Sequence, residues 1–262
     1  MSAGDPHASW PDRRPLTDTA GRTVLVYSLE ESARDGRPWA DGVWRPDDVT
    51  LADAAAEGLR QLAGHAVSTS DTALVAAWEA AGAELLRHAH VMTHDLGRLT
   101  AHQRPADLGL RSLSAAQVGR HAEALAAINL AAYPAGHPDH EHETLAAAVA
   151  EMEAISRGEL LGPVLPVSQV ALRDGIVGAA LIVDRPGTAP DGGPWVLDVF
   201  RDPASPAKGV GRALLHAALV AARHTGLPSM TLVVSHSNLN ARALYESLGF
   251  VDHSESWTLA LP

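Results

Sequence analysis

A short loop with two glycines and two cations is the first part of this chain that suggests chemistry. PAKGVGRALL, residues 206–215, places Gly209 and Gly211 between Lys208 and Arg212, just ahead of a helix-like run. A helix start leaves backbone N–H groups without partners and carries a partial positive charge. Glycines let an anion approach these groups closely. The loop therefore predicts a phosphate site, although a simple tight turn into a helix gives the same pattern.

The features that the loop lacks limit the class of phosphate-containing ligand that it could bind. A dinucleotide fingerprint has a third glycine, and a nucleoside-triphosphate loop continues with Lys followed by Ser or Thr. Neither feature is present after Gly211. These two ligand classes are therefore disfavoured, and the choice depends on a second motif downstream.

That second motif is SNLNARALYESLGF, residues 237–250, which follows a predicted strand. Together with LDVFRDPASPAKGVGRALL, residues 197–215, it resembles the GNAT superfamily, the GCN5-related N-acetyltransferases. The resemblance covers roughly residues 108–262 and is carried in the second motif by Asn238, Ala241, Leu244, Tyr245, Gly249 and Phe250. Pro206 departs from the family, which has Gln or Arg there. Because proline has no N–H group, one potential phosphate donor is missing.

The resemblance implies a cosubstrate, acetyl-CoA, and direct transfer of its acetyl group to an amine while both substrates are bound. In the family, the glycine loop holds the pyrophosphate and a backbone N–H of the fourth strand stabilises the oxyanion. Carried onto this sequence, the resemblance implies that acetyl-CoA contacts Val199, Phe200, Arg201, Ala207, Lys208, Gly209, Val210, Gly211, Arg212 and Asn238.

Two residues are the candidates for proton transfer. Tyr245 stands at the family's tyrosine position, so we assign it as the general acid for the departing thiolate; a packing role is the alternative. Asp198 lies in the middle of a predicted strand, where a carboxylate is costly unless it has a partner or a function. We assign it as the general base, with a purely structural carboxylate as the alternative. His236 and the acidic residues near 139–143 are further candidates for the base.

The histidine-rich segment YPAGHPDHEHETL, residues 133–145, suggests a metal site at first sight. Its spacing does not match His-Glu-x-x-His, and the chemistry that the resemblance implies needs no metal. We therefore expect no metal, and we expect Tyr133 and His137 to contact a cationic acceptor. A second cluster, RHAHVMTH at residues 87–94, alternates like a strand, and we expect its polar face to be solvated.

Apolar periodicity predicts the elements that position these residues. Over residues 108–262 the order is β-α-α-β-β-β-α-β-α-β, which favours a mixed α/β fold with helices on both faces of the sheet. A capping box at Ser114 and Gln117 begins the first helix, and Asp174-Gly175 predicts a hairpin turn. Residues 95–107 are a predicted linker, and residues 1–20 are predicted to be a loose tail.

An internal similarity extends the prediction to residues 21–94. VSTSDTALVAAWEAAGA, residues 67–83, aligns without a gap on residues 234–250, with Trp78 at the place of Tyr245 and Asp71 at that of Asn238. We therefore interpret residues 21–94 as a smaller, truncated GNAT-like unit with a structural role, chance similarity being the alternative.

Composition limits the class of protein. The 262 residues carry a net charge of −11 and include no cysteine. These values argue against a nucleic-acid surface and against disulfides, thiolate zinc sites and thiol nucleophiles. No continuous apolar segment reaches the length of about 18 residues that a membrane span needs. The first residues do not resemble a secretory signal. We expect a cytoplasmic monomer or homodimer that does not bind membranes.

The functional prediction is N-acetylation of a small molecule, a metabolite or an antibiotic-like compound. Acetylation of a peptide or protein amine is an alternative within the family. A catalytically silent module that binds acyl-CoA, as a sensor or for assembly, is the alternative from another class. The presence of Tyr245 favours an enzyme.

Overall fold

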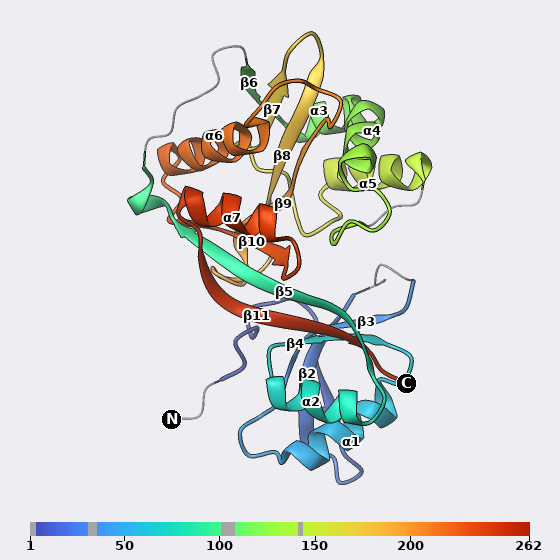
Figure 1. Cartoon of the computed structure of the whole chain (residues 1–262). Helices are drawn as coiled ribbons and strands as arrows, with labels where there is room; N and C mark the ends of the chain where they lie inside the picture. The colour runs from blue at the N-terminus through green and yellow to red at the C-terminus, as the bar shows by residue number, and fades with distance from the viewer. Residues whose placement is uncertain (1–3, 31–35, 101–107, 141–143) are drawn as a thin grey trace. The chain divides into compact units, whose positions relative to one another are not determined.

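The computed structural model describes residues 4–30, 36–100, 108–140 and 144–262. It divides into two compact units. The N-terminal unit comprises Met1–Val91 with Ser254–Pro262, and the C-terminal unit comprises Met92–His253. β5 (Glu84–Asp95) and β11 (Val251–Ala260) each contribute residues to both units (Figure 1). None of the helices in the described ranges has the length and apolar character needed to cross a membrane.

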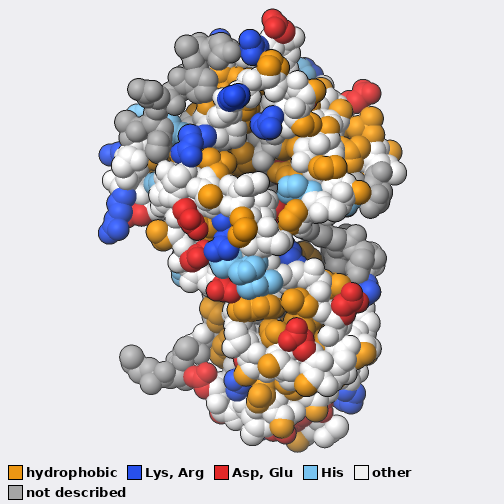
Figure 2. Space-filling view, in the orientation of Figure 1, with side chains coloured by type: hydrophobic (Ala, Val, Ile, Leu, Met, Phe, Trp, Pro, Cys, Tyr) orange, Lys and Arg blue, Asp and Glu red, His pale blue; other side chains and the backbone are white. Residues whose placement is uncertain are grey.

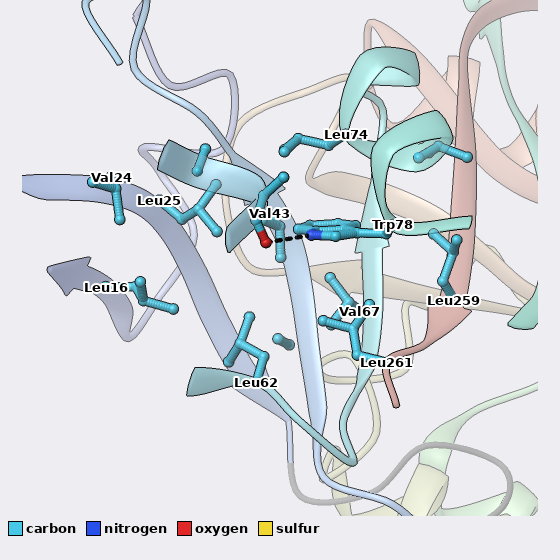
Figure 3. Close-up of a cluster of buried hydrophobic side chains, with 14 of the residues drawn as sticks. Leu16, Val24, Leu25, Val43, Leu62, Val67, Leu74, Trp78, Leu259 and Leu261 are labelled. Carbon is cyan, nitrogen blue, oxygen red and sulfur yellow. Dashed lines mark hydrogen bonds between the residues drawn. The ribbon is translucent and has the colours of Figure 1, made fainter. Parts of the chain in front are cut away.

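The N-terminal unit is a sheet with two helices. Its strand order is β1-β2-β3-β4-β11-β5. Its other elements are β1 (Arg13–Thr17), β2 (Thr23–Glu30), β3 (Trp39–Trp44), α1 (Leu51–Gln61), β4 (Ala66–Thr69) and α2 (Thr72–Ala80). Trp78 lies at the centre of its core, and its indole N–H donates to the Ala55 carbonyl at 3.1 Å (Figure 3). Gly58 makes room for the ring, because a Cβ there would lie 2.8 Å from Trp78.

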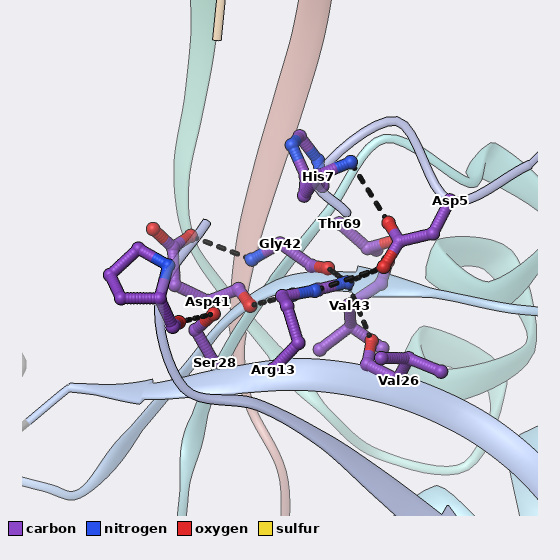
Figure 4. A network of polar contacts seen from close by, with 10 residues as sticks. Asp5, His7, Arg13, Val26, Ser28, Asp41, Gly42, Val43 and Thr69 are labelled. Carbon is purple, nitrogen blue, oxygen red and sulfur yellow. Dashed lines mark hydrogen bonds and ion pairs between the residues drawn. The ribbon is translucent and has the colours of Figure 1, made fainter. Parts of the chain in front are cut away.

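The prediction of a loose tail over residues 1–20 is wrong for the residues that the structure describes. β1 pairs antiparallel with β2, and Leu16 is buried. Arg13 forms an ion pair with Asp5 at 2.8 Å and also donates to the Gly42 carbonyl at 2.9 Å (Figure 4). These contacts join residues far apart in the sequence, so local composition rich in Pro and Asp could not reveal them.

The end of the chain also departs from the predicted boundaries. Residues 254–262 belong to the N-terminal unit, where β11 pairs antiparallel with β4 from Trp257–Thr69 to Ala260–Ala66. Leu259 and Leu261 are buried in the core of that unit. The predicted linker differs as well, because Leu96 is buried in the C-terminal unit. Residues 101–107, which complete the predicted linker, lie outside the described residues.

The C-terminal unit has the predicted order of elements with two differences. The first predicted helix is divided in two at His121, and most of the last strand, β11, lies in the N-terminal unit. The strand order of the C-terminal unit is β5-β10-β9-β8-β7-β6, antiparallel from β6 to β9 and parallel between β9 and β10. Its elements, after the short 3-10 turn Leu96–Arg98, are β6 (Gly109–Ser112), α3 (Ala115–Arg120), α4 (Ala122–Ala132), α5 (Leu145–Arg157), β7 (Gln169–Leu172), β8 (Ile176–Arg185), β9 (Gly193–Arg201), α6 (Val210–His224), β10 (Ser229–Ser235) and α7 (Leu239–Leu248).

Helices cover both faces of this sheet, because side chains of β8 alternate between two cores. Ala179 and Leu181 pack with α4 and α5, whereas Ala180 and Ile182 pack on the side of α6. The predicted capping box is present at Ser114 and Gln117. The mixed α/β fold and its helix placement are therefore confirmed.

The internal similarity is confirmed at the level of structure. β1-β2-β3-α1-β4-α2 repeats the order and strand directions of β7-β8-β9-α6-β10-α7. Asp71 and Asn238 both cap the helix that follows them with their side chains. Gly82 and Gly249 follow those helices with φ values of 97° and 99°. The two units thus share their local backbone geometry where their sequences align.

The polar face predicted for residues 87–94 is not solvated, since His90 and His94 are buried. In the C-terminal unit, His94 contacts the Leu248 carbonyl through Nε2 at 3.1 Å and packs edge-on against Phe250. Burial is the main cause that lowers the pKa of His94 from its ordinary value.

This burial predicts a loss of stability in acid. Below the ordinary histidine pKa, the unfolded chain protonates at position 94 before the folded chain does, so acid favours unfolding. The stability is present above the unfolded pKa and decreases as pH falls. We expect His94→Gln to reduce the decrease in urea midpoint between about pH 7.5 and 5.5. The exposed His253→Gln is the matched control; an equal change in both variants would contradict the prediction.

Candidate active site

β9 and β10 are neighbours for only a short distance. Their parallel register joins Trp195 to Thr231 and Val196 to Leu232, and within the described ranges it includes no later residue of β9. On its other side, β9 stays paired with β8 as far as Arg201. From Leu197 onward, no strand among the described residues therefore pairs with the edge of β9 opposite β8, and its backbone groups can serve a ligand.

A bulge at Leu197 determines where Asp198 points. Leu181 of β8 is opposite Asp198 and Ile182 is opposite Val196, so β9 has one extra residue. A bulge bends its strand and redirects side chains. Leu197 packs in the core beneath α4 and α5, and the next residue, Asp198, bonds to α4 as well. The bulge thus presents the carboxylate to α4.

Asp198 accepts a hydrogen bond on each carboxylate oxygen. The amide of Asn129 donates to Oδ2, and the hydroxyl of Tyr133 donates to Oδ1 at 2.6 Å. The same hydroxyl lies 3.0 Å from the Val199 carbonyl, at the edge of β9 that does not pair with β8. Burial, followed by the charge of Asp198, raises the pKa of Tyr133 well above its ordinary value. The Tyr133 hydroxyl therefore keeps its proton at neutral pH and can act as a hydrogen-bond donor.

The glycine loop has the geometry of an anion site. Gly209 has a φ of 71° and precedes α6, whose first N–H groups receive no side-chain cap. The loop borders a pocket of about 330 Å³ lined by Arg201, Pro203, Ser205, Pro206, Ala207, Lys208 and Gly209. Figure 2 shows Lys and Arg side chains gathered over α6 and β8. The N–H of Ala207 differs from the N–H groups at the start of α6, because it donates to a side chain within the loop, the Ser205 hydroxyl, at 3.3 Å.

Tyr245 lies on α7, which contacts the helix of the glycine loop. A Cβ on Gly211 would be 3.7 Å from Leu244, the residue before Tyr245. Burial raises the pKa of Tyr245 above its ordinary value, and the negative charges of Asp198 and Asp139 raise it further. Its hydroxyl forms no hydrogen bond with the residues that the structure describes. Tyr245 is therefore a protonated hydroxyl that can still donate to a ligand.

The segment after α4 is fastened to the start of α7 by Asp139. Its carboxylate accepts from the Ser235 hydroxyl at 2.6 Å and from the Asn238 amide at 2.7 Å. Asn238 also caps α7, accepting from the Ala241 N–H at 3.1 Å. His137 packs against Tyr133 with ring centroids 5.0 Å apart. This segment therefore brings both predicted acceptor residues to the side of the sheet where Asp198 bonds.

Tyr133 is in direct contact with both Asp198 and His137. The charges of Asp139 and Asp198 act on Tyr245. His236 is exposed beyond β10. Phe200 is buried in the core, so only its backbone can reach a ligand. Residues 141–143, part of the acidic segment predicted as a further source of the base, lie outside the described residues.

Sequence reasoning missed Asn129 and Ser235. Asn129 falls on the buried stripe of α4 with Ala122, Leu125 and Ala126, in helical steps of three and four. A polar residue on an apolar stripe needs a partner, so this position was recognisable. Nothing in the local sequence marked Ser235, whose partner is 96 positions away.

Comparison with known families decides the identity of this fold. Residues 122–250 match the family model described as "Acetyltransferase (GNAT) family". The C-terminal unit is a GNAT domain. The predicted family and fold are therefore confirmed, and the glycine loop and Tyr245 both lie within the matched residues.

Solved structures share this fold. A GCN5-related N-acetyltransferase from Sphaerobacter thermophilus has a TM-score of 0.66 at 16% identity, covering 95% of this chain and 79% of that one. One from Kribbella flavida has a TM-score of 0.61 at 17% identity, covering 96% and 90%. A tandem GNAT protein from the clavulanic acid biosynthesis pathway has a TM-score of 0.55 at 16% identity, covering 97% and 85%. A search of curated proteins found no match.

In the part of the N-terminal unit that the structure describes, two features of the GNAT site are absent. Its β3 and β4 remain paired as far as Val43 and Thr69, with one shift of register after Ala40, and the Thr69 hydroxyl donates to the Val43 carbonyl at 2.8 Å. Trp78, at the place of Tyr245, donates into its own core. Its strands thus remain joined where β9 and β10 separate in the GNAT domain.

Proposed function

We propose that this protein transfers the acetyl group of acetyl-CoA to the primary amine of a small cationic molecule. One observation carries the proposal: in a GNAT domain, the pKa of the half-buried Tyr245 is raised by burial and by the negative charges of Asp198 and Asp139. Such an arrangement suits an acceptor that arrives as an ammonium and a leaving group that departs as a thiolate.

The cosubstrate would use two parts of the domain. Its pyrophosphate would bind the N–H groups of Val210, Gly211 and Arg212, where the partial charge of α6 favours an anion. Its pantetheine arm would follow the edge of β9 that no strand occupies. A backbone N–H at that edge would then stabilise the oxyanion. GNAT proteins use acetyl-CoA, and the fit of this loop supports the same cosubstrate here.

The reaction needs one proton removed and one supplied. Asp198 takes a proton from the ammonium, directly or through water, and the free amine attacks the thioester carbon. The C–S bond then breaks, and Tyr245 donates its proton to the thiolate. The attacking nitrogen loses its second proton, which restores the Tyr245 hydroxyl, and Asp198 releases its proton to solvent. The balance is an ammonium and a thioester converted to an amide, a thiol and one released proton.

The acceptor class follows from the groups around Tyr245. Asp139 and Asp198 make the region negative, and the rings of Tyr133 and His137 provide an adjacent wall. A cation is therefore favoured over a neutral or anionic amine. A peptide or protein amine remains the alternative substrate, and a silent acyl-CoA-binding module the alternative function.

The test is a thiol-release assay with acetyl-CoA and a panel of amines. The panel contains diamines, amino sugars and other cationic metabolites, together with peptides that carry free amino termini or lysines. Turnover with a small cationic amine supports the proposal. Turnover with peptides alone favours the peptide alternative, and acetyl-CoA binding without any turnover favours the silent module.

The role of the glycine loop gives a separate prediction. Gly209→Ala forces a side chain onto a left-handed residue, which costs about 1–2 kcal/mol and displaces the N–H groups. We expect the Kd for acetyl-CoA, measured by calorimetry, to rise about tenfold. Gly226→Ala is the matched control, since Gly226 follows the same helix with a φ of 80°. Equal affinities of the two variants would remove the loop from the binding site.

A further inference from the structure

Asn129 is a buried polar residue on a helix face that is otherwise apolar. The buried residues of α4 are Ala122, Leu125, Ala126 and Asn129, and Asn129 is 7% exposed. Burying an amide without a partner is costly, whereas a hydrogen bond to a charged group offsets that cost. The side-chain amide of Asn129 donates to the carboxylate of Asp198 on β9. The apolar face of α4 is therefore interrupted by Asn129, the residue whose amide reaches the Asp198 carboxylate.

The two donors to Asp198 come from successive turns of one helix. Asn129 and Tyr133 are four residues apart, so they project from the same face of α4 at its C-terminal end. One donates to Oδ2 and the other to Oδ1. Two donors on different oxygens fix both the position and the plane of a carboxylate, which one donor cannot do. They also stabilise the ionised form over the neutral one.

We propose that Asn129 is a positioning residue, which together with Tyr133 holds the Asp198 carboxylate ionised and in one orientation for the acceptor ammonium. The inference deepens the proposed function and rests on it for the role of Asp198. It also changes the expected role of Tyr133, whose hydroxyl serves Asp198 and not the acceptor directly. Asn129 does not contact the reacting atoms and acts on the reaction only through Asp198.

The titratable groups that share the electrostatic surroundings of Asp198 include Tyr133 at the end of α4, Tyr245 on α7 and Asp139 in the segment after α4. Tyr133 donates to the carboxylate, whereas the charge of Asp139 acts in the opposite direction. Asp139 is an anion, so its charge opposes a second negative charge nearby. The donors from α4 offset this repulsion. Without Asn129, we expect Asp198 to retain its proton to higher pH.

The experiment measures Asp198 directly and does not depend on turnover. Carboxyl ¹³C NMR follows the aspartate side chains through a pH titration, and Asp198→Asn identifies the signal of Asp198 by its loss. We expect Asn129→Leu, which keeps the volume and removes the donor, to raise the titration midpoint by about one pH unit. Asn129→Asp places a second carboxyl beside Asp198 and is expected to raise it further.

Ile128→Val is the matched control, because Ile128 packs in the same core and its apolar side chain cannot donate a hydrogen bond to Asp198. We expect it to lower stability without moving the midpoint. An unchanged midpoint in both Asn129 variants, or an equal shift in Ile128→Val, overturns the inference.

The pH–rate profile then separates the inference from the proposed function. If the acidic limb of kcat moves with the NMR midpoint in Asn129→Leu, both stand. If the midpoint moves and the acidic limb does not, Asn129 still positions the carboxylate, but Asp198 is not the base. The KM for acetyl-CoA should change less than twofold, since the glycine loop is untouched.

Discussion

Tyr245→Phe is expected to lower kcat by about two to four orders of magnitude while the affinity for acetyl-CoA stays unchanged. Phenylalanine keeps the ring that packs against Phe250 and in the core of α6 and α7, so the fold should be preserved. In the proposed reaction, the variant lacks the hydroxyl proton that Tyr245 would give to the departing thiolate. The measurement is kcat with the best amine of the panel, together with calorimetry for acetyl-CoA.

The same variant carries a prediction about pH. Because burial and two carboxylates raise the pKa of Tyr245, its hydroxyl stays protonated through the working range. The ratio of wild-type to variant kcat should therefore be constant between about pH 6 and 9. Tyr27→Phe, a change of the same size in the N-terminal core, is the control and should leave kcat unaltered. An undiminished kcat in Tyr245→Phe would make Tyr245 a packing residue.

Deleting residues 254–262 is expected to unfold the N-terminal unit. The deletion removes the strand between β4 and β5, the buried side chains of Leu259 and Leu261, and the contact between His88 and Glu255 at 2.6 Å. Truncating one buried leucine typically costs about 2–5 kcal/mol, so losing two and a strand exceeds the stability of most domains of this size. Circular dichroism and urea unfolding would measure the loss.

A graded series makes this prediction sharper. Leu259→Ala alone should lower the urea midpoint without abolishing folding. Removal of Pro262, which is exposed, should have no effect. A synthetic peptide of residues 251–262 added to the truncated chain should restore strand signal if the β11 position is what was lost. A truncated chain with wild-type stability would contradict the placement of β11 in this unit.

The elements of the GNAT domain could be predicted because their signals are local. The capping box at Ser114, the turn at Asp174-Gly175 and the glycine after α7 each act within a few residues, and all are present. β1 and the end of β11 were misplaced because their stability comes from partners far along the chain. Residues 13–17 are too short for a reliable alternation, and only pairing with β2 makes them a strand.

In the candidate site too, features with local sequence signals could be predicted, and features that depend on distant partners could not. Tyr245 and the glycine loop follow from motifs with fixed spacing. Asp198 could be singled out as a carboxylate in an apolar strand, but its pairing with Asn129 and Tyr133 could not, because a bulge at Leu197 decides which face it reaches. Asn238 has an additional role that its motif does not suggest, since its amide fastens Asp139 to the start of α7.

The discontinuity of the N-terminal unit has a consequence for synthesis on the ribosome. Domains generally form in order as the chain emerges, first the N-terminal one. Here residues 92–253 form one uninterrupted unit, whereas the unit that starts first requires residues 254–262. Until these are translated, β4 has an uncovered edge that can pair with other chains. Of the two units, the N-terminal one is therefore synthesised first but completed last. Nascent chains that stall before residue 254 should be the ones that chaperones retain.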